Sequence, residues 1–551
     1  MRPLDWFVLI TTLCFLTGYG LYRSRGARST ANYLLAGRTM PWYAMALSIM
    51  ATQASAITFI STTGQGFVDG MRFVQFYFGL PLAMIIISLT AVPIFHRAGV
   101  YTAYEYLENR FDAKTRALVS GIFLIQRGLA MGVSLYAPAL VLSVILGWSD
   151  RWTTILMGIF IVAFTVLGGI KAITWTDTQQ MMIVSLGLLS ALFTALYLMP
   201  REVGFLDAVS LAGAAGRINP VTVKFDWNDR FNLFSGLIGG MFLALAYFGC
   251  DQSQVQRYLT GKSIAQSRLS LLFNAVAKIP MQFFILLIGT MVFAFYLFNA
   301  PPILFHPQKL KAVQTDPRFA AIDQRYQSAL ADRRTAAESY LAQDTPSTKR
   351  AFQEAHAKAE TVRKEAIALA GPGFNDTNYI FLTFVTTYLP AGLVGLLLAA
   401  IFGAAITTVS GELNSLATVS VIDIYRRFVN PNADDDHFLR ASQLATFFWG
   451  IYAIVTASYG GSWGALIETV NMLGSLFYGG LLGIFVLAFY FKHVGATPAF
   501  GAILIGEAAI FACWKFTQIS WLWYNVVGCV VVIAAGLLLQ AILRPAPASN
   551  S

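Results

Sequence analysis

The chain has 551 residues and a net charge of +10, and 56% of its residues are hydrophobic whereas only 12% are charged. A typical soluble domain carries about 25% charged residues, so this composition excludes an ordinary soluble enzyme. The basic residues stand singly between apolar stretches, which is typical of membrane topology and not of a nucleic-acid surface. We therefore expect a protein that crosses a lipid bilayer many times and binds no nucleic acid.

Apolar stretches of about 20 residues, the length at which a helix crosses hydrocarbon, predict an all-α polytopic membrane protein with about thirteen transmembrane helices. The first stretch lacks a preceding basic segment and a small-residue cleavage site, so we expect a retained helix and not a signal peptide. The helices are expected near residues 4–22, 41–66, 71–95, 117–146, 153–170, 177–199, 231–255, 269–298, 379–409, 439–458, 465–491, 496–516 and 521–543.

Basic residues gather in the connections on one side of these helices, for example at Arg97, Arg257, Arg426 and Lys492. Connections rich in Lys and Arg face the cytoplasm. With an odd number of helices, this rule predicts an N-terminus outside the cell and a cytoplasmic C-terminal tail, residues 544–551. The expected location is the plasma (inner) membrane.

One segment, residues 301–376, is rich in Ala, Lys, Arg, Glu and Gln and interrupts the apolar pattern. A helix stop followed by N-cap residues at 344–347 divides it into two Ala-rich stretches, which predicts a helical hairpin outside the membrane. A lid or a receptor surface is one interpretation. The other, a solvated decoration without substrate contact, is favoured because the charges converge on no point.

Two expected spans contain residues that interrupt a helix. Residues 48–70 place hydroxyls, a Gln and glycines inside an apolar stretch, and five spans later residues 243–259 combine Gly249 with Asp251. Broken helices survive at membrane depth only where they line a protein cavity, and their corresponding positions indicate inverted repeats. Thr407, Thr408 and Ser410 offer hydroxyl oxygens nearby in sequence, although such groups often bond back to their own helix.

Four ionisable residues lie inside expected spans, where each needs a polar neighbour: Arg127, Asp177, Lys278 and Glu412. Asp177 is interpreted either as a cap at the cytoplasmic start of its helix or as part of an ion path. Lys278 precedes Pro280 too deep in its span to reach water easily, so we expect it to contact the substrate or a partner group.

Five segments together resemble the sodium:solute symporter family, which includes bacterial sodium/galactose, sodium/proline and sodium/sialic acid transporters. They are SIMATQASAITFISTTGQG, GVYTAYEYLENRF, GGIKAITWTDTQQ, AYFGCDQSQVQRYLTGKS and AAITTVSGELNSLATVSVIDIYRR. The resemblance implies a leucine-transporter-type core of two inverted five-helix repeats and sodium-coupled import by alternating access. It also implies an organisation in five parts: an extra N-terminal helix and loop (1–40), repeat 1 with the first part of repeat 2 (41–300), the insert (301–376), the remainder of repeat 2 (377–491) and C-terminal helices with a short tail (492–551).

The resemblance also implies the residues that hold sodium. The backbone carbonyls of Ala51, Ala54 and Ala404 and the hydroxyls of Thr407 and Thr408 correspond to the family's common sodium site. Asp177 and Ser410 resemble part of a second ion site or path found in some members. Because those members have a serine where this chain has Gly411, the number of sodium ions stays open.

For the substrate, the resemblance places Lys278, Tyr247 and Asn471 on contacting residues of the galactose transporter, and Tyr77 where its sugar-binding glutamate stands. Further expected contacts are Ser55, Thr58, Gln75 and Arg127. Loss of the acid with retention of Lys278 and Arg127 favours a small organic anion, such as a carboxylate or a sugar acid. The alternatives are a neutral sugar or another polar solute.

We expect no enzymatic chemistry and no cofactor, with sodium as the coupling ion. The stretch TGKS (260–263) lacks the glycine that a phosphate-binding loop needs, since that position is Gln256. The four cysteines and five histidines are dispersed, so no metal other than sodium is expected. A transporter-like sensor and a channel are the rival classes. The expected partners are sodium, a small organic solute and the lipid bilayer, and the oligomeric state stays open.

Overall fold

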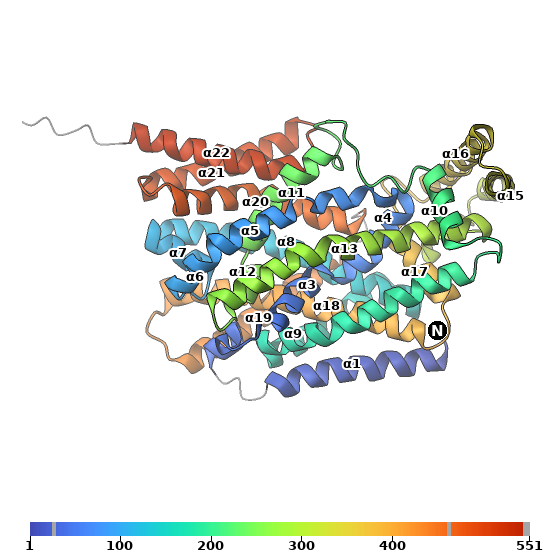
Figure 1. Cartoon of the computed structure of the whole chain (residues 1–551). Helices are drawn as coiled ribbons and strands as arrows, with labels where there is room; N and C mark the ends of the chain where they lie inside the picture. Colours follow the sequence, from blue (N-terminus) through green and yellow to red (C-terminus); the bar gives the residue numbers. More distant parts are fainter. Residues whose placement is uncertain (25–28, 460–463, 544–551) are drawn as a thin grey trace, which may run out of the picture.

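The structure, a computed structural model, describes residues 1–24, 29–459 and 464–543. The expected cytoplasmic tail, residues 544–551, lies outside the described residues. The long helices run roughly side by side along one axis (Figure 1). Together with shorter helices between them, the α-helices of this bundle are α1 (Pro3–Ser24), α2 (Thr30–Leu35), α3 (Trp42–Gln53), α4 (Thr63–Val68), α5 (Leu80–Leu89), α6 (Ala91–Ala98), α7 (Ala103–Arg110), α8 (Ala113–Leu146), α9 (Asp150–Tyr197), α11 (Gly240–Gly249), α12 (Gln252–Leu259), α13 (Ile264–Phe298), α17 (Thr377–Tyr388), α18 (Leu393–Thr418), α19 (Asp435–Ala457), α20 (Leu466–Tyr490), α21 (Ala496–Phe516) and α22 (Leu522–Ile542).

Shorter irregular helices and an extramembrane set complete the described part of the chain. The irregular ones are η1 (Ala36–Arg38), η2 (Thr58–Thr62), η3 (Gly70–Tyr77), η4 (Ser235–Gly239) and η5 (Val419–Val429). The remaining helices are α10 (Phe205–Ala214), α14 (Pro307–Val313), α15 (Phe319–Ala342) and α16 (Pro346–Leu369).

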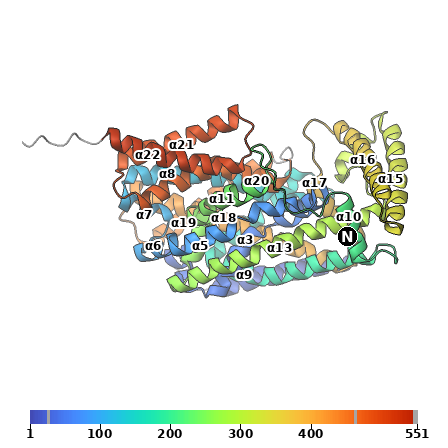
Figure 2. The ribbon, with the colours of Figure 1, turned by 45° about the horizontal axis from the view of Figure 1, so that its top comes forward.

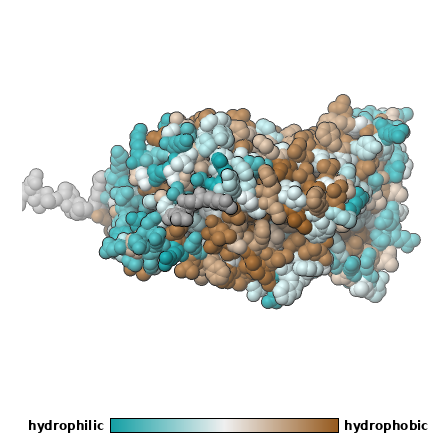
Figure 3. All heavy atoms as spheres, turned by 90° about the horizontal axis from the view of Figure 1, so that it is seen from below, coloured by the Kyte–Doolittle hydropathy of each residue, from teal (hydrophilic) through white to brown (hydrophobic). Residues whose placement is uncertain are grey.

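The surface has the pattern of a multi-pass membrane protein. An apolar band lies between two hydrophilic ends (Figure 3). Large apolar side chains such as Phe7, Leu167 and Leu444 are mostly exposed on the surface of the molecule. Such a surface is stable only against lipid. The N-terminus lies at the same end as α15 and α16, whereas α22 ends at the opposite end (Figure 1).

The expected count of about thirteen spans is not confirmed. Within the described residues, length and composition identify 10 membrane-crossing helices, or 11 if α3 and α4 form one broken span. Two expected spans, 153–170 and 177–199, correspond to the two parts of α9, which are separated by a kink at Gly169 (φ 57°, ψ −169°). A third expected span, 231–255, is divided among η4, α11 and α12.

Both predicted helix interruptions are confirmed. Helix α3 ends at Gln53, and the chain bends by 58° before it continues through η2 into α4. Ala54 has non-helical dihedral angles (φ −95°, ψ 54°). Helix α11 ends at Gly249, and α12 begins at Gln252 after Asp251, whose carboxylate accepts a hydrogen bond from the backbone N–H of Ser253. Both breaks are buried in protein, as the cost of unpaired backbone groups in lipid requires.

Helix α18 lies at the centre of the bundle, where it packs against α1, α8 and α9. Thr407, Thr408 and Ser410 are all buried in this helix. Their hydroxyls therefore face protein and not acyl chains.

The insert forms the predicted helical hairpin of α15 and α16, which lie next to each other at one end of the molecule (Figure 2). Thr345 caps α16 through the backbone N–H of Thr348. Arg333 and Arg334 in α15 donate hydrogen bonds to the carbonyls of Tyr296 (2.8 Å) and Phe298 (3.3 Å) at the end of α13. The carbonyls at a helix C-terminus have no donor within the helix, and these guanidiniums supply one. The hairpin is therefore hydrogen-bonded to the end of α13.

Candidate functional site

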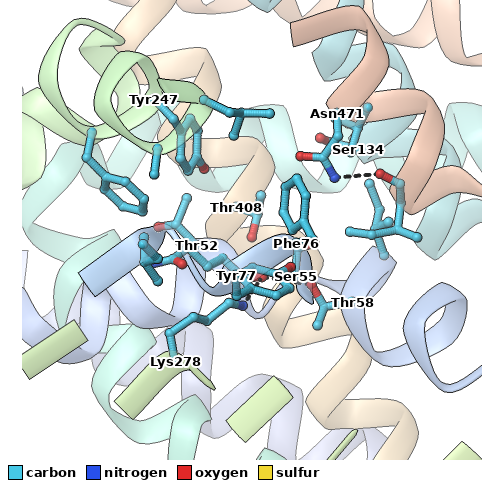
Figure 4. Close-up of a pocket in the computed structure, with 18 of the residues that line it drawn as sticks. Thr52, Ser55, Thr58, Phe76, Tyr77, Ser134, Tyr247, Lys278, Thr408 and Asn471 are labelled. Atoms are coloured by element: carbon cyan, nitrogen blue, oxygen red, sulfur yellow. Dashed lines mark hydrogen bonds between the residues drawn. The ribbon is translucent and has the colours of Figure 1, made fainter. Parts of the chain in front are cut away.

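A cavity of about 110 Å³ lies beside the break between α3 and η2 and is enclosed by side chains from η3, α8, α11, α13, α18 and α20 (Figure 4). In the view of Figure 4, Thr408 lies between Tyr247 and Asn471 on one side and Lys278 on the other. The lining residues are Thr52, Gln53, Ser55, Ile57, Thr58, Phe76, Tyr77, Leu80, Arg127, Ser134, Gly240, Leu243, Ala244, Tyr247, Phe248, Lys278, Thr408, Glu412, Ile467, Val470, Asn471 and Tyr478.

The broken helix presents oxygen atoms to this region. Carbonyls in the last turn of a helix lack the amide partners of the next turn, and Ala51 occupies that turn while Ala54 follows it. The neighbouring Gln53 carbonyl accepts hydrogen bonds from Thr58 (2.7 Å) and Lys278 (3.3 Å). The end of α3 is therefore a set of carbonyl oxygens beside the cavity.

Helix α18 packs against α3 and contributes hydroxyls. The Thr408 hydroxyl lines the cavity and is buried without a hydrogen-bond partner in the described part of the chain. The Thr407 hydroxyl lies 2.8 Å from the amide of Gln180 and 3.4 Å from the Ala404 carbonyl. The structure thus brings Thr408 and the α3 break to one cavity. The other expected sodium ligands are not among its described lining residues: Ala51, Ala54, Ala404 and Thr407.

Asp177 lies in the interior of α9 and is fully buried, so the interpretation as an interfacial cap is wrong. Its carboxylate accepts hydrogen bonds from Ser48 (2.6 Å) and Arg257 (2.8 Å). Ser410 bonds instead to Thr165 (2.7 Å). Neither Asp177 nor Ser410 is among the residues that line the cavity.

Arg257 was expected in a cytoplasmic connection, but its side chain is only 1% exposed. The guanidinium lies against Gly411, where an added Cβ would stand 2.4 Å from Arg257 Nη2. The sequence did not predict the pairing of Arg257 with Asp177. A buried arginine near a helix end has the same local sequence pattern as an arginine in a cytoplasmic connection.

Arg127 lines the cavity as expected, but it is already paired. It forms an ion pair with Asp251 and donates to Tyr478 (2.9 Å) and Glu412 (3.2 Å). Ser134, which the sequence reasoning did not single out, also donates to Glu412 (3.3 Å). A buried charge of this kind is stable because several groups of opposite charge or polarity surround it.

Lys278 is fully buried and faces the cavity from α13. Its Nζ lies 3.3 Å from the Gln53 carbonyl and 4.9 Å from the centre of the Tyr77 ring. Within the described residues it has no carboxylate partner. Burial of an ammonium group without an anion is costly, so this lysine is suited to a negatively charged ligand.

The other expected substrate contacts divide into two groups. Ser55, Thr58, Tyr77, Tyr247 and Asn471 line the cavity. Gln75 does not, because its amide accepts a hydrogen bond from the Thr222 N–H (2.8 Å) and donates to the Phe231 carbonyl (2.8 Å). Residues 301–376 contribute no lining residue among those described.

The chain is similar in sequence to known sodium-coupled transporters. The model of the sodium:solute symporter family matches residues 33–323 and 352–506. A sodium/sialic acid symporter of Proteus mirabilis is 25% identical over 98% of this chain and 96% of its own length. A sodium/glucose cotransporter of Vibrio parahaemolyticus is 26% identical over 94% and 86%. A sodium-coupled monocarboxylate transporter of Xenopus laevis is 25% identical over 92% and 70%.

A solved structure supports the same fold. The substrate-bound, outward-open state of a Na⁺-coupled sialic acid symporter superposes with a TM-score of 0.77, at 23% identity over 99% of both chains. The expected leucine-transporter-type fold is therefore confirmed.

Proposed function

Since the chain belongs to the sodium:solute symporter family, we propose that it imports a small carboxylate or sugar acid together with sodium by alternating access. The protein is a sodium-coupled symporter of a small organic solute, and it is a transporter and not an enzyme. The observation that supports it most is a broken helix packed against buried threonine hydroxyls beside a cavity that holds an unpaired lysine.

Sodium is assigned to the carbonyls of Ala51, Ala54 and Ala404 and to the hydroxyls of Thr407 and Thr408. Removal of a small cation from water is prohibitive unless other oxygens replace its hydration shell, and neutral carbonyl and hydroxyl oxygens are suitable hard ligands. The Thr408 hydroxyl, which has no hydrogen-bond partner among the described residues, supports this assignment. Sodium bound here joins α3 to α18 and favours the outward-open form in which the solute site is assembled.

Asp177 and Ser410 are assigned to the path of the ion and not to a second ion. The Asp177 charge is matched by Arg257, and Gly411 offers no hydroxyl. One sodium ion per solute is the stoichiometry that follows from this assignment.

The solute is assigned to the cavity, with its carboxylate at Lys278. Ser55, Thr58, Tyr77, Tyr247 and Asn471 form the remaining contacts, and Arg127 organises the wall through its ion pairs. The sodium/glucose cotransporter among the relatives keeps a neutral sugar as the alternative. The unpaired charge of Lys278 favours the carboxylate.

We assign the N-terminus and the insert to the outside of the plasma (inner) membrane and the C-terminal tail to the cytoplasm. The basic connections support this orientation. The position of the N-terminus and of α15–α16 at one end of the molecule is consistent with it.

Sodium-driven uptake into proteoliposomes tests the ion site. Loss of two of five ligands in the variant Thr407→Ala/Thr408→Ala is expected to weaken the apparent sodium affinity by at least about tenfold, or 1.4 kcal/mol. The control Thr194→Ala/Thr386→Ala removes hydroxyls that bond back to their own helices and should keep the wild-type affinity. Unchanged uptake by the first variant would remove the sodium assignment.

A further inference from the structure

A second hollow lies beside the broken segment of the chain. It is a groove of about 310 Å³ between the α3 break, α9 and α13, which pack against one another. Met50 and Phe59, on the two sides of the break, line this groove, whereas five residues between them line the cavity. Within the described part of the chain no residue lines both hollows, so the segment 50–59 contributes a wall to each of them.

The lining of the groove is apolar. Met281 and Phe284 of α13 and five residues of α9 between Met181 and Leu189 complete it. Ser185 is the only polar side chain among the described lining residues, and its hydroxyl donates a hydrogen bond to the carbonyl of Met181 in its own helix (2.9 Å). The groove therefore offers contact surface and no hydrogen bond, which suits a hydrocarbon chain and not a polar solute.

The groove opens toward lipid near the middle of the bilayer. Ser185 lies about halfway along the second part of α9, and Met281 lies about halfway along α13. Around the opening, Leu189 is 39% exposed, and its neighbours Met182 and Leu186 are 66% and 59% exposed. Apolar side chains exposed on membrane helices face hydrocarbon. In a core about 30 Å thick the headgroups lie about 15 Å away, so the ends of acyl chains are the part of a lipid that reaches the groove.

Packing, and not the hydrophobic effect, is the force that holds a chain in such a groove. Lipid tails are as apolar as the lining, so transfer from the bilayer into the groove gains no hydrophobic free energy. An unfilled groove, however, leaves the lining atoms without van der Waals partners on one side, and a chain end restores those contacts. Because the bilayer surrounds the opening with chains at all times, this occupant needs no separate source.

We propose that the groove is a binding site for the end of a lipid acyl chain, which enters between α9 and α13 and packs against the broken helix. The Met50 carbonyl accepts a hydrogen bond from the N–H of Ala54 (2.8 Å), and the Phe59 N–H donates to the Ser55 carbonyl (3.2 Å). These hydrogen bonds flank the break on its two sides, so the chain contacts both parts of the broken helix at once. The bound lipid thereby restrains the bend beside the cavity.

Photolabelling of the wild-type protein tests the site. The protein is placed in phosphatidylcholine nanodiscs in which some chains carry a diazirine, either at the chain end or next to the headgroup, and labelled peptides are identified by mass spectrometry. Residues 156–160 of α9 are the internal reference, because they lie about halfway along the first part of this helix and include exposed apolar side chains. The chain-end probe should label residues 181–189 and 281–284 at least about fivefold more than this reference, and the headgroup probe should show no excess.

A matched pair of variants tests the position of the chain. Ser185→Trp places an indole in the opening of the groove, which should exclude the chain because a packed interior has no room for both. Leu186→Trp adds the same ring at the neighbouring, lipid-exposed position that does not line the groove. Chain-end labelling of residues 281–284 should fall to the level of residues 156–160 in the first variant and stay within about twofold of wild type in the second.

The wild-type measurement decides the proposal even if Ser185→Trp does not fold. Equal chain-end labelling of the groove segments and of residues 156–160 would show ordinary contact with surrounding lipid and would overturn the site. A folded Ser185→Trp protein with unchanged labelling of residues 281–284 would also overturn it. Absence of label together with a disulfide-linked dimer that forms only in Ser185→Cys would assign the groove to a second copy of the chain instead.

Discussion

Replacement of Lys278 by methionine separates a binding role from a structural one. The lysine is fully buried. Among the described residues, its Nζ has the Gln53 carbonyl at 3.3 Å and the face of Tyr77 as its partners. Methionine has a similar length and no charge. If Lys278 is needed for the fold, the protein should become less stable on this change. If Lys278 serves to bind an anionic solute, the substrate-free protein should become more stable.

The magnitudes follow from these contacts. A hydrogen bond to a charged group contributes about 1.5–3 kcal/mol, so loss of the ammonium should weaken carboxylate binding by about 10-fold to 150-fold. The same change removes the cost of an unpaired buried charge, so the substrate-free protein should become more stable. Each kcal/mol corresponds to a rise of about 2–4 °C in melting temperature for a chain of 150–250 residues, and this longer chain should show a smaller rise per kcal/mol.

The assay is a thermal melt in detergent, with and without a carboxylate solute and in the presence of sodium. Lys278→Met should melt at a higher temperature than the wild type without solute and should show no carboxylate-dependent shift. The control Lys515→Met, at an exposed position near the end of α21, should leave the carboxylate-dependent shift intact. A Lys278→Met protein that is less stable yet binds the carboxylate within about twofold of wild type would refute the reasoning.

Two further predictions concern other buried basic side chains. Gly411→Ala places a Cβ 2.4 Å from Arg257 Nη2 and should push the guanidinium away from Asp177. The melting temperature should therefore fall. In the control Gly121→Ala, the added Cβ would have no neighbour from another described helix within 4 Å, so the melting temperature should be unchanged. In the insert, the pKa of His356 is lowered from 6.5 to about 3. Burial is the largest cause, and the charges of Arg217 and Arg333 contribute further. Below pH 6.5 the unfolded insert therefore binds a proton that the folded insert does not, so its stability should decrease as the pH falls toward 3. Amide exchange in α16 at about pH 4.5 and about pH 7 measures this, and His356→Gln should abolish the dependence.

Local chemistry was sufficient to predict the features that depend on a few adjacent residues. Hydroxyls and glycines within 48–70 predicted the break after Gln53, and Gly249 with Asp251 predicted the second break. The stop and cap at 344–347 predicted the hairpin turn before α16. In each case the backbone departs from a helix because neighbouring side chains compete for its hydrogen bonds or remove steric restraint.

The partners of buried charges could not be predicted in this way. Arg257 meets Asp177 across 80 positions of sequence, and Arg127 meets Glu412 across 285. Such pairs depend on how the helices pack, which no local pattern encodes. The same reason explains Gln75, which faces the connection near Phe231 although its neighbours Phe76 and Tyr77 line the cavity.

The hydrogen bonds between the α15–α16 hairpin and α13 couple a water-exposed part of the protein to the helix that carries Lys278. Arg333 and Arg334 hold the last carbonyls of α13, so a tilt of this helix during transport must carry α15 with it. A fluorophore or a nanobody attached to the outer face of the hairpin would then report the transport cycle from outside the membrane. Such a probe leaves the cavity untouched, because the described lining residues come from other parts of the chain.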